Sequence, residues 1–290
     1  MIKVDKSNLT VPYVLMNDCS SPTGEKQKAI DYFEQGKGEK VEFTVYKNKE
    51  VKNVLHTLFN NKCAYCESAI NFAGSLHIEH WRPKGCVTGH SAHKGYYWLA
   101  SEWDNLLLAC PKCNSSHKKN HFPLKNGTYA IKSTDNYKIL ETALLINPCE
   151  TDPKEHIHFE SHGFIYGLTR EGEESIKIYG LDRSSLTNRR GKFENVVKGY
   201  VEDIIFIMED LLEEIEELNT SNNISLEKKE KILRKIRKYK KGIKKKVDDL
   251  RSYNLPESEY LAMVENIFEE YENIYSGNIL ILTILKKVRI

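Results

Sequence analysis

Two Cys-x-x-Cys pairs, Cys63/Cys66 and Cys110/Cys113, constrain the fold of this 290-residue chain more than any other feature. The turn within such a pair brings both sulfurs within reach of one ion. Four thiolates in two pairs are typical ligands of tetrahedral zinc. A short segment cannot build a large hydrophobic core by itself, so a bound zinc ion would stabilise the chain between the pairs. The sequence therefore predicts a structural zinc site.

Composition indicates a water-soluble globular protein, since 40% of the residues are hydrophobic and 29% are charged. The chain contains no apolar run of eighteen residues and starts without a signal peptide. We therefore expect a cytoplasmic protein without a membrane partner, in which cysteines stay reduced. Cys19, Cys86 and Cys149 have no partners in the sequence pattern and are expected to be incidental or buried thiols.

Between the cysteine pairs, the pattern of apolar residues predicts a ββα unit. A helix is expected from about Lys49 to Phe59, because apolar residues recur there at helical spacing. Residues 76–80 alternate in polarity and predict a strand, and residues 106–109 predict a short buried strand. Ser115 is a suitable first-turn residue for a short helix after the second pair.

The whole chain is predicted to have an α+β fold in which a zinc-stapled ββα core precedes a mainly α-helical C-terminal region. Turn signals in the middle of the chain indicate mixed connectors and a small hairpin around His162-Gly163. The predicted segments are an N-terminal arm (1–45), the core (46–125), a mixed connector region (126–190) and the helical C-terminal region (191–290).

The C-terminal region carries an acidic helix followed by a basic helix over residues 225–247. Opposite charges on consecutive helices favour an antiparallel hairpin in which the charges face each other. The alternative is that the basic helix follows a phosphate backbone. The net charge of +2 decides nothing here, because a nearly balanced chain can still carry a local basic groove.

The chemically active residues are expected between the two cysteine pairs, at Glu79-His80. Imidazole titrates near neutral pH, so His80 is a natural general base for activating water. Adjacent side chains on a strand point to opposite faces, so both can serve one site only if the chain bends at His80. His77 lies on the same strand face as Glu79 and could be either a further ligand or a structural histidine.

His80, Asn105 and Asn114 resemble the HNH (ββα-metal) endonucleases, in their His-Asn-Asn variant. This resemblance implies a phosphodiester hydrolase with His80 as the general base. It also implies that Glu79 and Asn114 bind a catalytic Mg²⁺ or Mn²⁺, while Asn105 braces the loop through backbone hydrogen bonds. Asn114 stands where the motif was named for a histidine, and an amide oxygen still suits a hard cation.

Residues 62–67, 78–84 and 103–110 are similar to a subgroup of bacterial antiphage HNH nucleases, the nuclease subunits of Septu systems and of some retrons. The similarity extends over residues 46–190. It implies an antiphage effector that is held by an ABC-type ATPase subunit and cuts nucleic acid during infection. DNA is the favoured substrate, with RNA, including transfer RNA, left open.

Basic residues border the predicted site and are candidate phosphate contacts: Arg82, Lys84, Lys118 and Lys119. His117 and His121 follow the second cysteine pair and are expected to face solvent or phosphate. The three tryptophans are expected in the core of the unit. The alternative function is a non-catalytic zinc module that binds nucleic acid or a protein partner within a defence complex.

Overall fold

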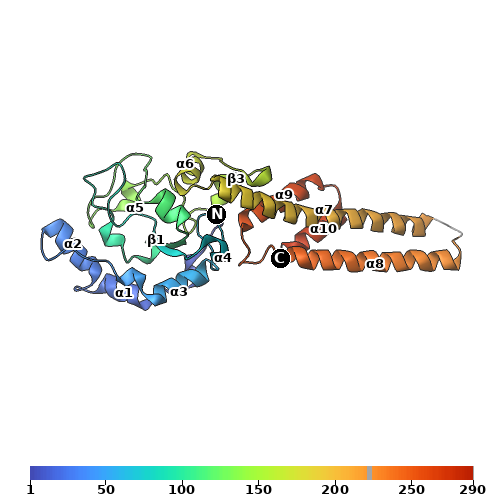
Figure 1. The fold of residues 1–290 in the computed structure, drawn as a ribbon, viewed down its shortest axis with the longest axis horizontal. Coiled ribbons are helices and arrows are strands. Elements are labelled where there is room, and N and C mark those ends of the chain that lie inside the picture. The colour runs from blue at the N-terminus through green and yellow to red at the C-terminus, as the bar shows by residue number, and fades with distance from the viewer. Residues whose placement is uncertain (221–223, 290) are drawn as a thin grey trace. The chain divides into compact units, whose positions relative to one another are not determined.

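A computed structural model describes residues 1–220 and 224–289, and the chain divides into two compact units. The first unit comprises Met1–Glu160 and Phe164–Thr187, and the second comprises Ser161–Gly163 and Asn188–Ile290. Helices and short strands together make an α+β fold, as predicted (Figure 1). None of the helices within the described ranges is long and apolar enough to cross a membrane.

The first unit combines short helices with two small antiparallel sheets. Its helices are α1 (Tyr13–Ser20), α2 (Glu25–Gln35), α3 (Lys49–Leu58), α4 (Ile70–Ala73), α5 (Tyr137–Leu140) and α6 (Arg170–Tyr179). Its strands are β1 (His77–His80), β2 (Leu106–Ala109), β3 (Ile157–Phe159) and β4 (Ile165–Gly167). It also has 3-10 helices at Lys6–Asn8, Val45–Lys47, Tyr97–Leu99, Trp103–Asn105 and Pro153–Glu155, and a π-helix at Lys112–Lys118.

The pairing of β1 with β2 forms the centre of the first unit. The strands are antiparallel, with Glu79 opposite Leu107 and His80 opposite Leu106. Every residue of β2 is buried, whereas β1 changes from an exposed His77 to a buried Glu79 and His80. Both strands were predicted from the sequence, and the structure confirms them.

Helix α3 packs against β2 and confirms the predicted helix before the first cysteine pair. Val51 and Leu55 are its buried residues, one helical turn apart, and the side chain of Asn48 caps its first turn by accepting from the Glu50 N–H. The helix is followed by Asn60 and Asn61, which both have positive φ angles, 49° and 56°. This left-handed pair ends the helix and directs the chain into Cys63.

The helix after β2 begins earlier than predicted. Residues Lys112–Lys118 form a π-helix, whereas the sequence predicted a helix from about Asn114, with Ser115 in its first turn. The difference has a local cause, because the N–H of Cys113 donates to the Cys110 sulfur (3.4 Å) and the N–H of Asn114 donates to the Cys110 carbonyl (2.9 Å). The second cysteine turn is therefore itself the first turn of the helix.

The predicted hairpin around His162 is also present, with β3 paired antiparallel to β4. Helix α6 packs against β4, and its tight approach needs Gly172: a Cβ there would lie 1.9 Å from the His156 carbonyl oxygen. Thr169 caps α6 through its side chain, and Gly180 ends it in a left-handed conformation with φ 62°. This arrangement places Tyr179, at the end of α6, fully inside the first unit.

The second unit contains the helices α8 (Leu226–Arg251), α9 (Leu261–Ile274) and α10 (Ile279–Val288), together with α7 (Ser184–Thr220) from Asn188 onward. Helices α7 and α8 run side by side in opposite directions (Figure 1). Their acidic and basic faces meet in three ion pairs, Lys228–Glu217, Lys235–Glu214 and Lys246–Asp203. The predicted antiparallel hairpin with charges facing across is thus confirmed.

Candidate functional site

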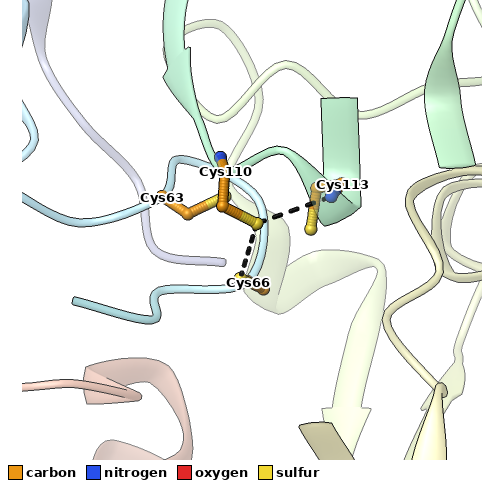
Figure 2. Close-up of side chains that lie close together, drawn as sticks. All are labelled: Cys63, Cys66, Cys110 and Cys113. Carbon is orange, nitrogen blue, oxygen red and sulfur yellow. Dashed lines mark hydrogen bonds between the residues drawn. The ribbon is translucent and has the colours of Figure 1, made fainter. Parts of the chain in front are cut away.

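The four paired cysteines converge in the first unit, as Figure 2 shows. All four are buried, and their sulfurs lie within 4.8 Å of one another. Zinc–sulfur bonds of about 2.3 Å in a tetrahedron separate the sulfurs by about 3.8 Å. The Cys66 and Cys110 sulfurs are 3.9 Å apart. The cluster can therefore bind a structural metal ion such as zinc.

Local backbone geometry holds each cysteine turn in place. The Cys63 N–H donates to the Ser68 carbonyl, the Glu67 N–H donates to the Cys63 carbonyl, and Glu67 has a left-handed φ of 60°. The Ala64 N–H donates to the carbonyl of Leu108 on β2 at 2.8 Å. The first turn is therefore attached to the strand that leads into the second turn.

The surroundings of the cluster favour the thiolate, the form that binds metal, at two of the four cysteines, whereas burial raises the pKa of Cys63 and the hydrogen bond with Cys110 raises that of Cys113. A hydrogen bond with Cys110 holds the pKa of Cys66 well below its usual value, and a hydrogen bond with Cys113 lowers the pKa of Cys110. Arg183 donates from Nη1 to the Cys113 sulfur (3.4 Å) and to the Gly180 carbonyl (2.7 Å). This guanidinium supplies a positive charge that offsets part of the charge of four thiolates.

A pocket of about 750 Å³ opens beside the end of β1. Three of the predicted catalytic and metal-binding residues line it: Glu79 and His80 from β1, and Asn114 from the helix Lys112–Lys118. The adjacent residues Glu79 and His80 thus border one pocket at the point where the strand ends. Asn105, the fourth predicted residue, lies behind this wall and is buried.

His80 is held as a neutral imidazole. Its ring is 6% exposed, and Nε2 lies 3.0 Å from the Ala100 carbonyl oxygen. A carbonyl oxygen only accepts, so Nε2 carries the proton and Nδ1 keeps a lone pair. Burial, followed by the positive charge of Lys84, lowers the pKa of His80 to about 3. The Tyr46 ring contacts the His80 ring edge-on, at a centroid distance of 4.5 Å.

Glu79 is restrained from one side only. Its Oε1 forms an ion pair with the Lys118 ammonium at 2.7 Å and accepts a hydrogen bond from the Tyr65 hydroxyl at 3.4 Å. Its other carboxylate oxygen has no hydrogen-bond partner among residues 1–220 and 224–289. Lys118 is completely buried and also donates to the His80 carbonyl at 3.0 Å. One lysine thus fixes both the carboxylate and the backbone of the next residue.

Asn105 connects the chain on either side of the site. Its Oδ1 accepts from the Arg82 N–H at 2.7 Å, and its Nδ2 donates to the carbonyls of Arg82 (3.0 Å) and Leu99 (3.1 Å). The Trp81 N–H in turn donates to the Asn105 carbonyl at 2.9 Å. These bonds are of the bracing kind that the resemblance implies, and they hold the segment that follows His80.

The four candidate phosphate contacts fall into two groups, and this corrects the sequence-based prediction. Arg82 is buried in an ion pair with Glu141 (3.0 Å), and Lys118 is buried against Glu79, so neither is free for a phosphate. Lys84 and Lys119 instead line the pocket. The sequence could not show which of the four basic residues are buried, because Arg82 and Lys118 are buried against acidic residues that lie far away along the chain or on another element.

Lysines dominate the charge of the pocket. Lys84 and Lys119 are joined there by Lys40, Lys47 and Lys52 from the segments before the first cysteine pair. Within the described parts of the chain, none of these five forms an ion pair. Glu79 is the acidic residue of the lining, and Lys118 already balances it. The pocket is therefore suited to an anionic ligand.

The sequence analysis did not identify the pocket wall formed by the N-terminal arm. Phe33, Phe43 and Tyr46 line the pocket and are half-buried. Phe43 precedes a 3-10 turn and Tyr46 lies in it, so neither helical nor strand periodicity marks them. The available signal was the pair of aromatic residues between Lys40 and Lys47.

The remaining predicted side chains have simpler surroundings. His77 is exposed and lines the pocket, so both of its alternatives stay open. His117 differs from the prediction, because its half-buried ring packs against Gly180, where a Cβ would lie 2.4 Å from Nδ1. Trp81, Trp98 and Trp103 are buried, which confirms their assignment to the core.

Comparison with known proteins finds three relatives. The chain is 42% identical over 199 residues to Septu protein PtuB of Bacillus mycoides, a match that covers 66% of each protein. It is 29% identical over 175 residues to Septu protein PtuA of the same organism, which covers 57% of this chain and 24% of that protein. A Septu protein PtuB of Bacillus thuringiensis is 26% identical over 141 residues, 48% of this chain and 44% of that one.

The chain thus spans just under two thirds of the length of the first of these relatives, and less of the other two. No protein-family model matches it, and no solved structure does. The similarity to the first relative is far too high to arise by chance. The chain is therefore a homologue of the Septu proteins PtuB.

Proposed function

We propose that this chain is a metal-dependent HNH endonuclease that hydrolyses phosphodiester bonds in nucleic acid. The observation that carries the proposal is the pocket in which a buried, neutral His80 meets Glu79 and Asn114 among lysines without ion pairs. A phosphodiester substrate needs a base for water and positive charge around its phosphate. The pocket offers both.

His80 acts as the general base in this proposal. Since Nε2 donates to the Ala100 carbonyl, Nδ1 is the nitrogen that takes a proton from water. The low pKa keeps the ring neutral, and therefore able to accept, throughout the physiological pH range. The water oxygen forms a bond to phosphorus as the bond from phosphorus to the 3′ oxygen breaks, and the departing oxygen takes a proton from solvent, which leaves a 5′-phosphate and a 3′-hydroxyl end.

Glu79 and Asn114 would hold the catalytic Mg²⁺ or Mn²⁺. Both are oxygen donors on one pocket, and one Glu79 carboxylate oxygen has no hydrogen-bond partner in the described chain. This donor set fits a hard cation that takes few protein ligands and completes its shell with water and phosphate oxygens. When bound, such an ion polarises the phosphate and stabilises the departing oxygen.

Lys84 and Lys119 are the side chains that bind and orient the phosphate in this proposal. Lys84 is half-buried with its ammonium over the Tyr46 ring, 4.9 Å from the centroid. The hydrogen bonds of Asn105 hold the Arg82 end of the segment that leads to Lys84. A positive charge fixed in this way needs little reorganisation when the substrate charge develops.

We further propose a role in antiphage defence, together with a partner that contains an ABC-type ATPase. The support comes from relatives that are named as Septu proteins, and from the family resemblance of residues 62–110. In the PtuA relative the matched segment makes up 24% of the protein, so a related segment there is joined to a longer chain. A segment related to this chain is thus covalently joined to further sequence in that relative, which fits the proposal that this chain works together with a second protein.

Substituting His80 by alanine tests the enzymatic proposal. The purified full chain and the His80→Ala variant are incubated with plasmid DNA and with total RNA, with Mg²⁺, with Mn²⁺ or without added divalent cation. We expect cleavage by the parent chain with a divalent cation and a loss of at least 100-fold, about 3 kcal/mol, in the variant. His121→Ala is the matched control, since His121 is exposed and outside the pocket lining.

Zinc content and circular dichroism must match among the three proteins, so that lost activity reports lost chemistry. Cleavage retained by His80→Ala would refute the role of His80. Nucleic-acid binding without cleavage by any of the proteins would instead assign a non-catalytic zinc module.

A further inference from the structure

We propose that the pocket accepts an unpaired strand, so that the substrate is single-stranded nucleic acid whose base stacks on the Phe43 ring of the aromatic wall formed by Phe43 and Tyr46. The inference rests on the proposed function for the cleavage step, while the recognition step rests on the pocket alone. Three observations support it: the rings in the wall, the placement of the lysines, and the size and depth of the pocket.

Phe43 offers the ring in this wall that has no structural partner among the described residues. Phe43 is half-buried, lines the pocket and has no ring contact among the described residues. Tyr46 is already engaged: its ring contacts His80 at an interplanar angle of 77°, and the Lys84 ammonium lies over it, 4.9 Å from the centroid. Proteins that bind single strands stack the bases on aromatic rings whose faces are uncovered and lie beside basic side chains.

Lysines flank these rings in the sequence and line the same pocket. Lys40 and Lys47 are exposed on the same short segment as Phe43 and Tyr46, and Lys84 and Lys119 line the same pocket from other segments. A strand of nucleic acid alternates bases with phosphates. A segment in which two rings lie between two ammonium groups offers contacts for both parts of that strand.

The depth of the pocket argues against an intact duplex. His80 is 6% exposed, and the pocket volume of about 750 Å³ falls in the range of roughly 300–1,000 Å³ that takes a single drug-sized ligand. That space suits one or two nucleotides. In a duplex the bases are stacked on each other and unavailable to the aromatic wall, so a strand must be unpaired or a nucleotide flipped out to use it.

A binding measurement tests this inference. The full-length His80→Ala variant is mixed, without added divalent cation, with fluorescein-labelled strands of about 12 nucleotides: single-stranded DNA, single-stranded RNA and a blunt DNA duplex. Fluorescence anisotropy should show one or both single strands bound at least tenfold more tightly than the duplex. Equal or tighter binding of the duplex would overturn the inference, as would no binding of either single strand.

The comparison of DNA with RNA identifies the source of the strand. Tighter binding of single-stranded DNA or of single-stranded RNA assigns the natural substrate. A preference for either strand supports the inference. A preference for RNA would indicate a contact to the 2′-hydroxyl, and equal affinity would indicate recognition through stacking and phosphates alone.

Removing one ring tests the stacking step itself. Phe43→Leu keeps an apolar side chain without a flat face and should weaken single-strand binding roughly 5- to 150-fold, with little effect on the duplex. Phe43→Trp should retain or tighten the binding. The matched control is Phe206→Leu, which removes a 65% exposed ring from α7 outside the pocket lining. Equal affinity of the Phe43→Leu variant and the control would refute the role of the aromatic wall.

Cleavage assays distinguish failure of this inference from failure of the enzymatic proposal. Single strands that bind through Phe43 but are never cut refute the endonuclease and leave the recognition inference standing. A duplex that is cut efficiently, with Phe43→Leu as active as the parent chain, refutes the recognition inference and leaves the endonuclease standing.

Discussion

At the residue scale, Lys118 is the side chain on which the site geometry most depends. It has no exposed surface, and its ammonium reaches both the Glu79 carboxylate and the His80 carbonyl. A buried ion pair need not stabilise a fold relative to an apolar pair of the same volume. This pair instead fixes one carboxylate oxygen and the end of β1, which gives it a positioning role next to the proposed active site.

Removing the Lys118 charge should therefore be costly. Lys118→Met leaves the buried Glu79 carboxylate without its counter-charge, and we expect the free energy of unfolding to fall by about 3–5 kcal/mol in urea denaturation. Lys119→Met is the matched control: it removes the neighbouring, exposed lysine and should change stability by less than about 0.5 kcal/mol. Equal effects of the two substitutions would contradict the structural role of Lys118.

His93 is a second buried histidine, outside the proposed active site, with both ring nitrogens occupied. Nε2 donates to the Ala130 carbonyl at 2.8 Å, and Nδ1 accepts from the Gly95 N–H at 2.9 Å. Burial lowers the pKa of His93 below its usual value. A second proton would break the bond from Gly95, so the fold requires the neutral ring.

This requirement predicts a pH dependence of stability. Below the unfolded-state pKa of about 6.5, the unfolded chain binds a proton at His93 that the folded chain does not, so stability falls as pH falls through that value. In His93→Gln the fall in urea midpoint from pH 7.5 to about pH 5 should be smaller than in the parent chain. His121→Gln, at an exposed histidine, should follow the parent. Identical slopes for all three proteins would refute the prediction.

At the element scale, the sequence was most informative where the pattern is local. Helix α3, strands β1 and β2 and both cysteine turns follow from apolar spacing, turn residues and ligand spacing within the segment 49–113. The pocket wall could not be predicted in this way. It brings Phe43 and Tyr46 from an irregular segment to the end of β1, and only the folded backbone determines that approach.

The burial of charged residues was equally inaccessible to sequence reasoning. Arg82 lies close to Lys84 in the sequence, and Lys118 directly precedes Lys119, and all four side chains are basic. Arg82 and Lys118 nevertheless form buried ion pairs. Their partners are Glu141, which is 59 residues away from Arg82, and Glu79 across the sheet–helix contact. A charge run in a sequence gives the number of charges and does not indicate which of them face a ligand.

The α7–α8 hairpin allows a direct test of charge pairing between elements. Glu214→Lys places two ammonium groups together where Lys235 now meets Glu214, and should destabilise the protein by about 1 kcal/mol at low salt. Adding Lys235→Glu restores an ion pair in which the two charges have exchanged helices, and it should recover most of the lost stability. Both changes in stability should be smaller in about 1 M salt, because the Debye length is then about 3 Å and the charges are largely screened.

Thermal unfolding of the two single variants and the double variant measures this coupling. Glu213→Lys is the matched control, since Glu213 is exposed and forms no ion pair within the described residues. Additive effects of the Glu214 and Lys235 substitutions would show that the pair contributes nothing to the hairpin.

At the scale of the whole molecule, both units have an apolar core, and the first unit also holds the cysteine cluster. The second unit has an apolar helical core that includes Val264, Ile267 and Phe268 of α9. The first unit has short strands of three or four residues, of which β2 packs against α3 and is also attached to the first cysteine turn by the hydrogen bond from Ala64 to Leu108. The metal should therefore matter far more for the first unit than for the second.

The final prediction follows from this difference. The purified chain should contain about one zinc ion, because a structural zinc site with four cysteine ligands contributes roughly 10–16 kcal/mol of apparent binding free energy at pH 7. Cys110→Ser should lose the zinc, and limited proteolysis with mass mapping should then find cuts within residues 1–160 while α8 and α9 stay protected. Cys86→Ser is the matched control, since Cys86 is exposed and outside the cluster. A Cys110→Ser variant that kept its zinc and resisted proteolysis would show that the cysteine cluster does not hold the first unit together.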